Sequence, residues 1–117
     1  MINSSYSFEG NQIKIGDNFK ELDYPIQDII NLEKDNKIIV LFDRDSNIRS
    51  WGQFPNIICL SNKGDKLWTA ELPTTNTGDS YHSMELKEGK LVGYSWCSFM
   101  SIIDLNTGKI LERIFTK

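Results

Sequence analysis

A repeated unit constrains the fold of this chain more than any other feature: a short apolar run, a glycine turn and then an alternating run. The unit occupies residues 56–68 and again residues 101–111, and a related turn lies between them at residues 87–90. Glycine beside asparagine or a charged residue accepts the positive backbone angles of a tight hairpin. Each copy is therefore predicted to form two antiparallel strands.

Strand patterns continue outside the repeat. Residues 6–15 predict an opening hairpin with one apolar face. A strand is expected over about residues 26–33, with Ile26, Ile30 and Leu32 on one face. Residues 37–42 form an uninterrupted, β-branched apolar run, which is typical of a strand buried on both faces. This strand is predicted to lie at the centre of the sheet.

One segment is ambiguous. Phe19, Leu22 and Ile26 follow helical spacing, but Pro25 would interrupt a long helix. A short helical turn is predicted near residues 18–22, and nine or ten strands are expected in the whole chain. The predicted fold class is all-β: antiparallel sheets that form a sandwich or partial barrel built from consecutive hairpins. Residues 1–117 are interpreted as a single domain, since a chain of 117 residues is long enough for one core without disulfides or metals.

Charge is unevenly placed along the chain. The net charge is −3, but residues 1–35 hold seven carboxylates against three lysines, whereas residues 36–117 hold nine acids and ten bases. The first segment is therefore at −4 and the second at +1. Nucleic-acid binding needs a basic surface, so direct binding of nucleic acid is not expected. An acidic segment suits a basic protein partner instead.

Two long polar segments are the predicted recognition loops, at residues 43–55 and 73–81. Aromatic side chains among charged neighbours are typical of protein-binding hot spots. The predicted partner-binding residues are those with this character in the two loops: Asp43, Asp45, Arg49, Trp51, Asp79 and Tyr81. The alternative for Trp51 is that it folds back over the sheet edge. Trp68 and Trp96 lie in alternating runs and are predicted to be core residues.

The glycine turns also resemble a known repeat. Residues 103–111, with the turn Asp104-Leu-Asn-Thr-Gly-Lys109, look like the turn between strands in quinoprotein-type β-propeller blades, and residues 60–68 are similar. The resemblance covers residues 56–115 and implies blade-like hairpins in an antiparallel sheet. Propellers usually need four to eight blades, and two blade-like units cannot close such a ring. The resemblance therefore implies sheet architecture and no cofactor site.

Catalytic and metal-binding patterns are weak. Residues 43–47 match the start of a calcium loop, but Ile48 and Phe54 replace its glycine and its glutamate, so no metal is predicted. His82 is the single histidine and lacks a nucleophile-elbow motif. The glycines show no nucleotide-binding spacing, and no cofactor is expected. Cys59 and Cys97 are interpreted as reduced thiols in apolar runs.

In size, acidity and organisation the chain resembles immunity proteins of bacterial toxin systems, including those paired with contact-dependent inhibition toxins. This resemblance implies a non-enzymatic protein that binds and neutralises a cognate toxin, such as a basic nuclease, by occluding its active or substrate-binding surface. Two alternatives remain: a β-repeat protein-binding scaffold, and a small hydrolase using His82. The chain shows neither a secretory signal nor a membrane span, so a cytoplasmic location without membrane contact is expected.

Overall fold

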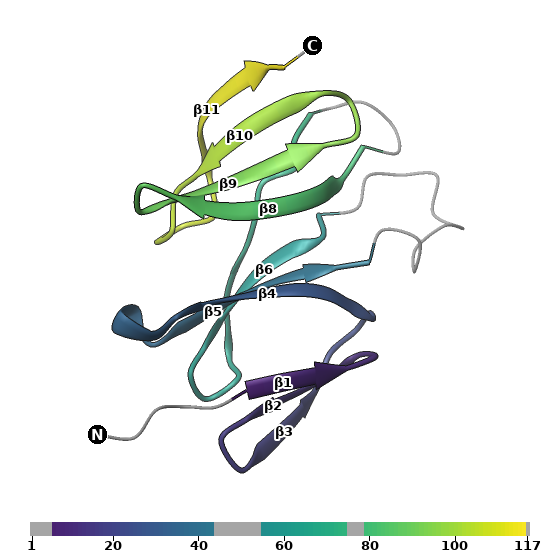
Figure 1. Cartoon of the computed structure of the whole chain (residues 1–117), viewed down its shortest axis with the longest axis vertical. Helices are drawn as coiled ribbons and strands as arrows, with labels where there is room; N and C mark the ends of the chain where they lie inside the picture. Colours follow the sequence, from purple (N-terminus) through teal and green to yellow (C-terminus); the bar gives the residue numbers. More distant parts are fainter. Residues whose placement is uncertain (1–5, 44–54, 75–78, 117) are drawn as a thin grey trace.

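The computed structural model describes residues 6–43, 55–74 and 79–116 and confirms the predicted all-β class. Within these ranges the chain forms eleven strands and one 3-10 turn. The strands make three antiparallel sheets, and each sheet is a meander whose strands are paired in the order of the sequence. The sheets stack in layers as a sandwich, with no closed barrel, in the order A, B and C from the bottom to the top of Figure 1.

The three sheets follow one another along the chain. Sheet A contains β1 (Tyr6–Glu9), β2 (Gln12–Ile15) and β3 (Asn18–Glu21). Sheet B contains β4 (Ile26–Leu32), β5 (Lys37–Phe42), β6 (Ile57–Ser61) and β7 (Lys66–Thr69), with the 3-10 turn Glu33–Asp35 between β4 and β5. Sheet C contains β8 (Tyr81–Lys87), β9 (Lys90–Ser95), β10 (Phe99–Ile103) and β11 (Ile110–Phe115). In the described part of the chain, no helix has the length and apolar character needed to cross a membrane.

The glycine hairpins form where the repeat predicts them. They join β6 to β7, β8 to β9 and β10 to β11, and Gly64, Gly89 and Gly108 have φ values of 90°, 79° and 79° in these turns. The positive φ explains why glycine recurs at this place in each copy. Each turn returns the chain along the strand that it has just left, so three short local signals specify three strand pairs.

The helical turn predicted near residues 18–22 is wrong, because Asn18–Glu21 is strand β3. The turn at Gly16 and Asp17 reverses the chain and pairs Ile15 with Asn18. Phe19 then points outward and is 70% exposed, whereas Leu22 is buried. The apparent helical spacing therefore joins residues that lie on different faces.

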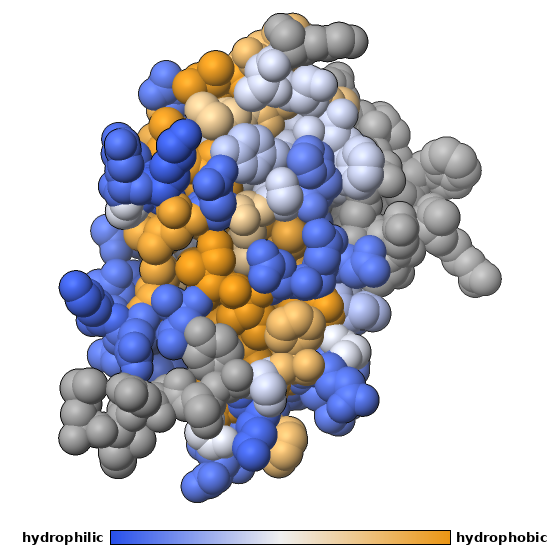
Figure 2. Space-filling view, viewed as in Figure 1, coloured by the Kyte–Doolittle hydropathy of each residue, from blue (hydrophilic) through white to orange (hydrophobic). Residues whose placement is uncertain are grey.

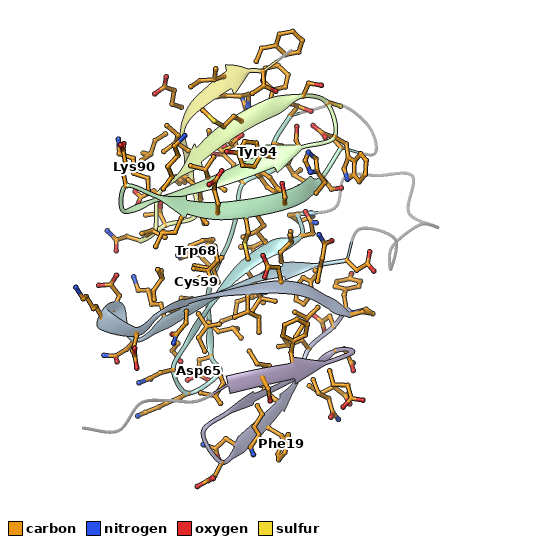
Figure 3. The ribbon with its side chains drawn as sticks, in the orientation of Figure 1. Phe19, Cys59, Asp65, Trp68, Lys90 and Tyr94 are labelled. Atoms are coloured by element: carbon orange, nitrogen blue, oxygen red, sulfur yellow. The ribbon has the colours of Figure 1, made fainter. Side chains whose placement is uncertain are left out.

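Sheet B is the middle layer, and its two faces form two separate cores. Along β5, Ile39 and Leu41 pack toward sheet C, whereas Ile38, Val40 and Phe42 pack toward sheet A. This confirms that the continuous apolar run is a strand buried on both faces, inside its sheet. In Figure 3, Cys59 and Trp68 lie between sheets B and C, and Phe19 lies on the distant face of sheet A.

The expectation that Ile26, Ile30 and Leu32 share a face holds for Ile30 and Leu32 and is wrong for Ile26. Ile26 packs in the core between sheets A and B, whereas Leu32 packs in the core between sheets B and C. The register of β4 against β5 shifts between Ile26 and Asp28. A bulge of this kind adds one residue and reverses the alternation of side chains beyond it.

Two glycines of sheet C leave room for rings of the core between sheets B and C, one ring from sheet C itself and one from sheet B. A Cβ atom on Gly93 would lie 2.6 Å from the ring of Tyr81, and one on Gly108 would lie 2.5 Å from the ring of Trp68. Both rings therefore fill space that only glycine leaves open. The Trp68 indole also donates a hydrogen bond to the Leu105 carbonyl oxygen, at 2.9 Å. Sheet C is thus seated on sheet B in one specific arrangement.

Candidate functional site

Strand β5 ends, and strands β6 and β8 begin, at one end of the stack, on the right in Figure 1. We call this end the loop end, because the described ends of the two predicted loops lie there. Asn56 joins the bases of the two loops. Its side-chain Nδ2 donates hydrogen bonds to the carbonyl oxygens of Phe42 (3.0 Å) and Tyr81 (2.7 Å), and its Oδ1 accepts one from Tyr81 N–H (2.9 Å). Asn56 is fully buried. One buried amide therefore fixes the start of the first loop relative to the end of the second.

Asp79 closes the second loop. Its carboxylate accepts hydrogen bonds from the Thr74 hydroxyl (2.5 Å), the Ser80 N–H (3.0 Å) and the Cys97 N–H (3.2 Å). Trp96 N–H donates to the Ser80 carbonyl oxygen, at 3.1 Å. The end of this loop is therefore attached to the turn that follows β9.

The six predicted partner-binding residues have different outcomes. Asp45, Arg49 and Trp51 lie outside the described residues. Asp43 is half-buried at the start of the first loop. The expectation that Asp79 and Tyr81 are exposed is wrong, since they are 1% and 0% exposed.

The burial of these two residues has a physical reason. The Asp79 carboxylate accepts the hydrogen bonds that close the second loop. The Tyr81 ring fills the space beside Gly93 in the core between sheets B and C. The Tyr81 hydroxyl donates to the Glu71 carbonyl oxygen, at 2.7 Å, and burial raises the pKa of this phenol above its usual range. Both side chains therefore stabilise the loop end from buried positions and do not lie on its surface.

A group of rings lies on sheet C beside the loop bases. The His82 ring is 5.2 Å from that of Trp96, in an edge-to-face arrangement, and 6.5 Å from that of Tyr94. With Phe99, these rings line a cavity of about 220 Å³ whose remaining walls are Ser95, Ser98 and Thr116. We call this cavity the aromatic pocket. The expectation that Trp96 is a core residue is wrong, because this side chain is 57% exposed, whereas Trp68 is buried as predicted.

The sequence pattern does not reveal the aromatic pocket, because alternation groups Trp96 with Tyr94 without showing that this side of sheet C is open to solvent. Strand β9 ends at Ser95, and the chain turns at Trp96, Cys97 and Ser98, where Ser98 has a φ of 70°. The small polar residues on both sides of Trp96 were the available signal. They favour a strand end over a buried strand interior.

Carboxylates gather on the sheet A side of the loop end. The N–H groups of Leu22, Ile26 and Asp43 donate to the carbonyl oxygens of Asn11 (2.8 Å), Gly10 (2.8 Å) and Pro25 (2.9 Å) respectively. These bonds bring together the β1–β2 turn, the β3–β4 connection and the base of the first loop. The acidic residues in these segments are Glu9, Glu21 and Asp23, which are exposed, and Asp43. We call these four residues the carboxylate edge.

A larger cavity of about 510 Å³ lies next to this edge, between sheets A and B. Its apolar walls include Leu22, Tyr24 and Phe42, and the Tyr24 and Phe42 rings meet edge to face at 5.5 Å. Lysines and carboxylates both border the opening, among them Lys20 and Glu21. Figure 2 shows hydrophilic residues on the left side of the view, and apolar residues that reach the surface through its middle and at the top.

Residues 3–115 match a family described as a domain of unknown function, DUF7957. The chain belongs to this family. No curated protein matches the chain at a significant level.

One similar solved structure is the crystal structure of the computationally designed Ika8 protein. It is 12% identical in sequence, with a TM-score of 0.59 over 96% of this chain and 36% of that one. The chain thus spans about a third of the designed protein's length. At this identity the likeness concerns the fold alone.

The chemistry around His82 is limited among the described residues. The ring Nδ1 lies 3.2 Å from the Ser83 hydroxyl, and Gln27 donates to the His82 carbonyl oxygen at 2.9 Å. No described carboxylate forms a hydrogen bond to this imidazole, and Asp79 is used in closing its loop. Within the same ranges, no group of three histidine, cysteine or acidic residues is arranged to hold a metal ion.

The two cysteines are free thiols in different surroundings. Cys59 is fully buried between sheets B and C, and burial raises the pKa of its thiol to about 11. Cys97 is partly exposed at the loop end. The structure therefore gives the two thiols very different access to solvent.

Proposed function

We propose that this protein acts by stoichiometric protein binding through the loop end, as a cytoplasmic immunity protein that neutralises a cognate bacterial toxin. The observation that carries the proposal is Trp96, a large exposed ring held at the edge of two loops whose bases are fixed by buried hydrogen bonds. Exposed tryptophans at well-packed positions are frequent binding hot spots. The stack of consecutive meanders serves as a rigid scaffold in this proposal.

Rigid loop bases favour tight binding. A surface that must become ordered on binding loses free energy for each side chain and segment that it immobilises. Asn56 and Asp79 already hold the ends of both loops in the free protein. The loops can therefore cover a partner's active or substrate-binding surface at a smaller entropic cost than free segments would incur.

The carboxylate edge supports a basic partner. Glu9, Glu21 and Asp23 are exposed on the same side of the loop end, within the acidic N-terminal third. Complementary charge accelerates encounter and improves specificity. A nuclease toxin has a basic substrate-binding surface because it binds phosphates, so the proposed partner is a nuclease domain.

Coexpression with genes adjacent to the coding sequence tests the function. We expect one neighbouring product to be toxic alone, to be neutralised by this protein and to copurify with it in a 1:1 complex. Trp96→Ala should weaken the complex by at least about 30-fold, the effect of a hot spot near 2 kcal/mol. The matched control is Phe19→Ala, which removes an exposed ring from the outer face of sheet A. Failure of every neighbouring gene product to be toxic and bound would overturn the immunity proposal.

Charge reversal tests the role of the carboxylate edge. The double variant Glu21→Lys with Asp23→Lys should slow association by about tenfold at low salt, and by less at high salt, since electrostatic steering is screened by ions. Dissociation should change little. A variant that leaves the association rate and its salt dependence unchanged would contradict a basic partner while leaving the hot-spot role of Trp96 open to its own test.

A further inference from the structure

The aromatic pocket has the shape and lining of a site for one cationic side chain. We propose that it binds an arginine side chain of the protein partner, with the guanidinium in the cavity, against the rings of Tyr94, Trp96 and His82 that line it. This inference rests on the proposed function, since it names the group that the partner inserts at the loop end.

The ring geometry is the first argument. The His82 ring centroid lies 5.2 Å from that of Trp96 and 6.5 Å from that of Tyr94. A cation is attracted to the face of an aromatic ring when it lies within about 6 Å of the ring centroid. A group placed in this pocket can therefore interact with more than one ring. Trp96 forms one exposed wall, so a side chain of a partner can reach the pocket from solvent.

Charge gives the second argument. The Tyr94 hydroxyl donates a hydrogen bond to the carboxylate of Glu85, and this bond raises the pKa of the phenol. Glu85 is exposed on β8, so its carboxylate lies beside the hydroxyl of Tyr94, one of the pocket-lining rings, with solvent access. A guanidinium stacks on aromatic faces and binds carboxylates through a planar fork of donors. Rings beside a carboxylate match both properties.

Pocket size gives the third argument. Cavities for cofactors and drug-sized ligands usually measure roughly 300–1,000 Å³. The aromatic pocket, at about 220 Å³, is smaller than this range and opens beside the loop bases, where the proposed partner lies. It suits the end of one side chain better than an independent small molecule.

The probe for the test is N-acetyl-arginine methylamide, and its matched control is the citrulline analogue, which has nearly the same shape without the charge. The full-length ¹⁵N-labelled protein is titrated with each at pH 8, and the Trp96 indole N–H resonance is assigned by its loss in Trp96→Phe. We expect the Trp96 signal to shift in a saturable way with the arginine probe, and affinity to be about fivefold or more weaker for citrulline. Equal shifts with both probes, or no shift with arginine, would overturn the site.

Two variants sharpen this result. Glu85→Gln keeps the shape of an exposed side chain and should weaken arginine binding about threefold or more by removing the carboxylate charge. Tyr94→Leu removes a ring and should weaken it further. Phe19→Leu, at the opposite side of the stack, should change nothing. If Tyr94→Leu does not fold, Glu85→Gln alone decides the test, and unchanged affinity in that variant contradicts the proposed role of the carboxylate.

The inference and the proposed function fail in different ways. A toxin complex that depends on Trp96, in a protein that does not distinguish arginine from citrulline, keeps the function and rejects the arginine site. Selective arginine binding in a protein that neutralises no neighbouring toxin keeps the site and rejects the immunity function.

Discussion

The two outer sheets of the stack differ on their solvent-facing sides. Sheet A presents Ser7, Lys14 and Phe19 in one cross-strand row, and Lys14 lies 5.7 Å from the centre of the Phe19 ring. Sheet C presents Tyr94 beside Met100, on the face opposite to its core residues Leu91 and Ile103. The outer face of sheet A is therefore mainly polar, whereas that of sheet C is rich in apolar side chains. Of the two outer faces, that of sheet C therefore exposes more apolar side chains to solvent, next to the aromatic pocket.

The inner sides of the same sheets also differ. Sheet A meets sheet B through aliphatic side chains such as Ile13 and Ile15. Sheet C meets sheet B through a core that includes the Tyr81 and Trp68 rings and through buried polar contacts of Asn56. Aliphatic packing is tolerant of small shifts, whereas directional hydrogen bonds and ring fits are not. The position of sheet C on sheet B is therefore fixed by buried side-chain hydrogen bonds and ring fits, whereas a backbone hydrogen bond from Ile26 N–H to the Gly10 carbonyl oxygen adds to the aliphatic packing of sheet A.

The largest expected effect comes from breaking the polar junction of sheets B and C. Asn56→Ala removes three hydrogen bonds of buried groups and should lower the free energy of unfolding by about 3 kcal/mol or more, as measured by urea denaturation. The control is Asn106→Ala, at an exposed turn, which should change stability by less than about 0.5 kcal/mol. Similar losses in the two variants would contradict the role of Asn56.

A truncation in sheet A should have the next largest effect, and a more local one. Ile13→Ala removes a fully buried side chain from the aliphatic core and should cost about 2–4 kcal/mol. Because sheet A is joined to sheet B mainly through that core, its amides should lose protection from hydrogen exchange more than those of sheet C. Equal loss of protection in both sheets would contradict this prediction, because it would show that sheets A and C unfold together.

Local signals in the sequence predicted most of the strands. Glycine turns and alternating or continuous apolar runs act over a few residues, so the hairpins and the doubly buried strand β5 could be found from the pattern alone. The burial of Tyr81 could not, because it depends on Asn56, which lies 25 residues earlier in the chain. The exposure of Trp96 could not be predicted either: Trp96 lies beside Tyr94, as the alternation predicts, but whether that side of sheet C is covered depends on the stacking of distant parts of the chain. The scaffold was therefore more predictable than the site.

A tight ring fit should make sheet C sensitive to one added methyl group. Gly93→Ala would place a Cβ atom 2.6 Å from the Tyr81 ring, and the strain should cost about 1–3 kcal/mol in thermal or urea denaturation. Removing the ring should make room for the methyl group, so Tyr81→Ala combined with Gly93→Ala should cost less than the sum of the single variants. Additive losses would mean that the methyl group is accommodated without displacing the ring.

The smallest expected effects concern the two thiols, in their reaction with a reagent and in the stability of the protein at alkaline pH. At pH 8, a thiol reagent should modify Cys97 rapidly and Cys59 only upon unfolding, since Cys59 is fully buried.

Burial raises the pKa of Cys59 to about 11, so the native thiol holds its proton more strongly than the unfolded one. The stability that follows is present below the unfolded pKa, near 8.5, and is lost as the pH rises toward 11. Cys59→Ala should therefore reduce the loss of stability between pH 8 and pH 10.5, while Cys97→Ala should not. If both variants keep the alkaline loss of the original protein, Cys59 ionisation is not its cause, and the Tyr81 phenol, whose pKa burial also raises, becomes the candidate among the described residues.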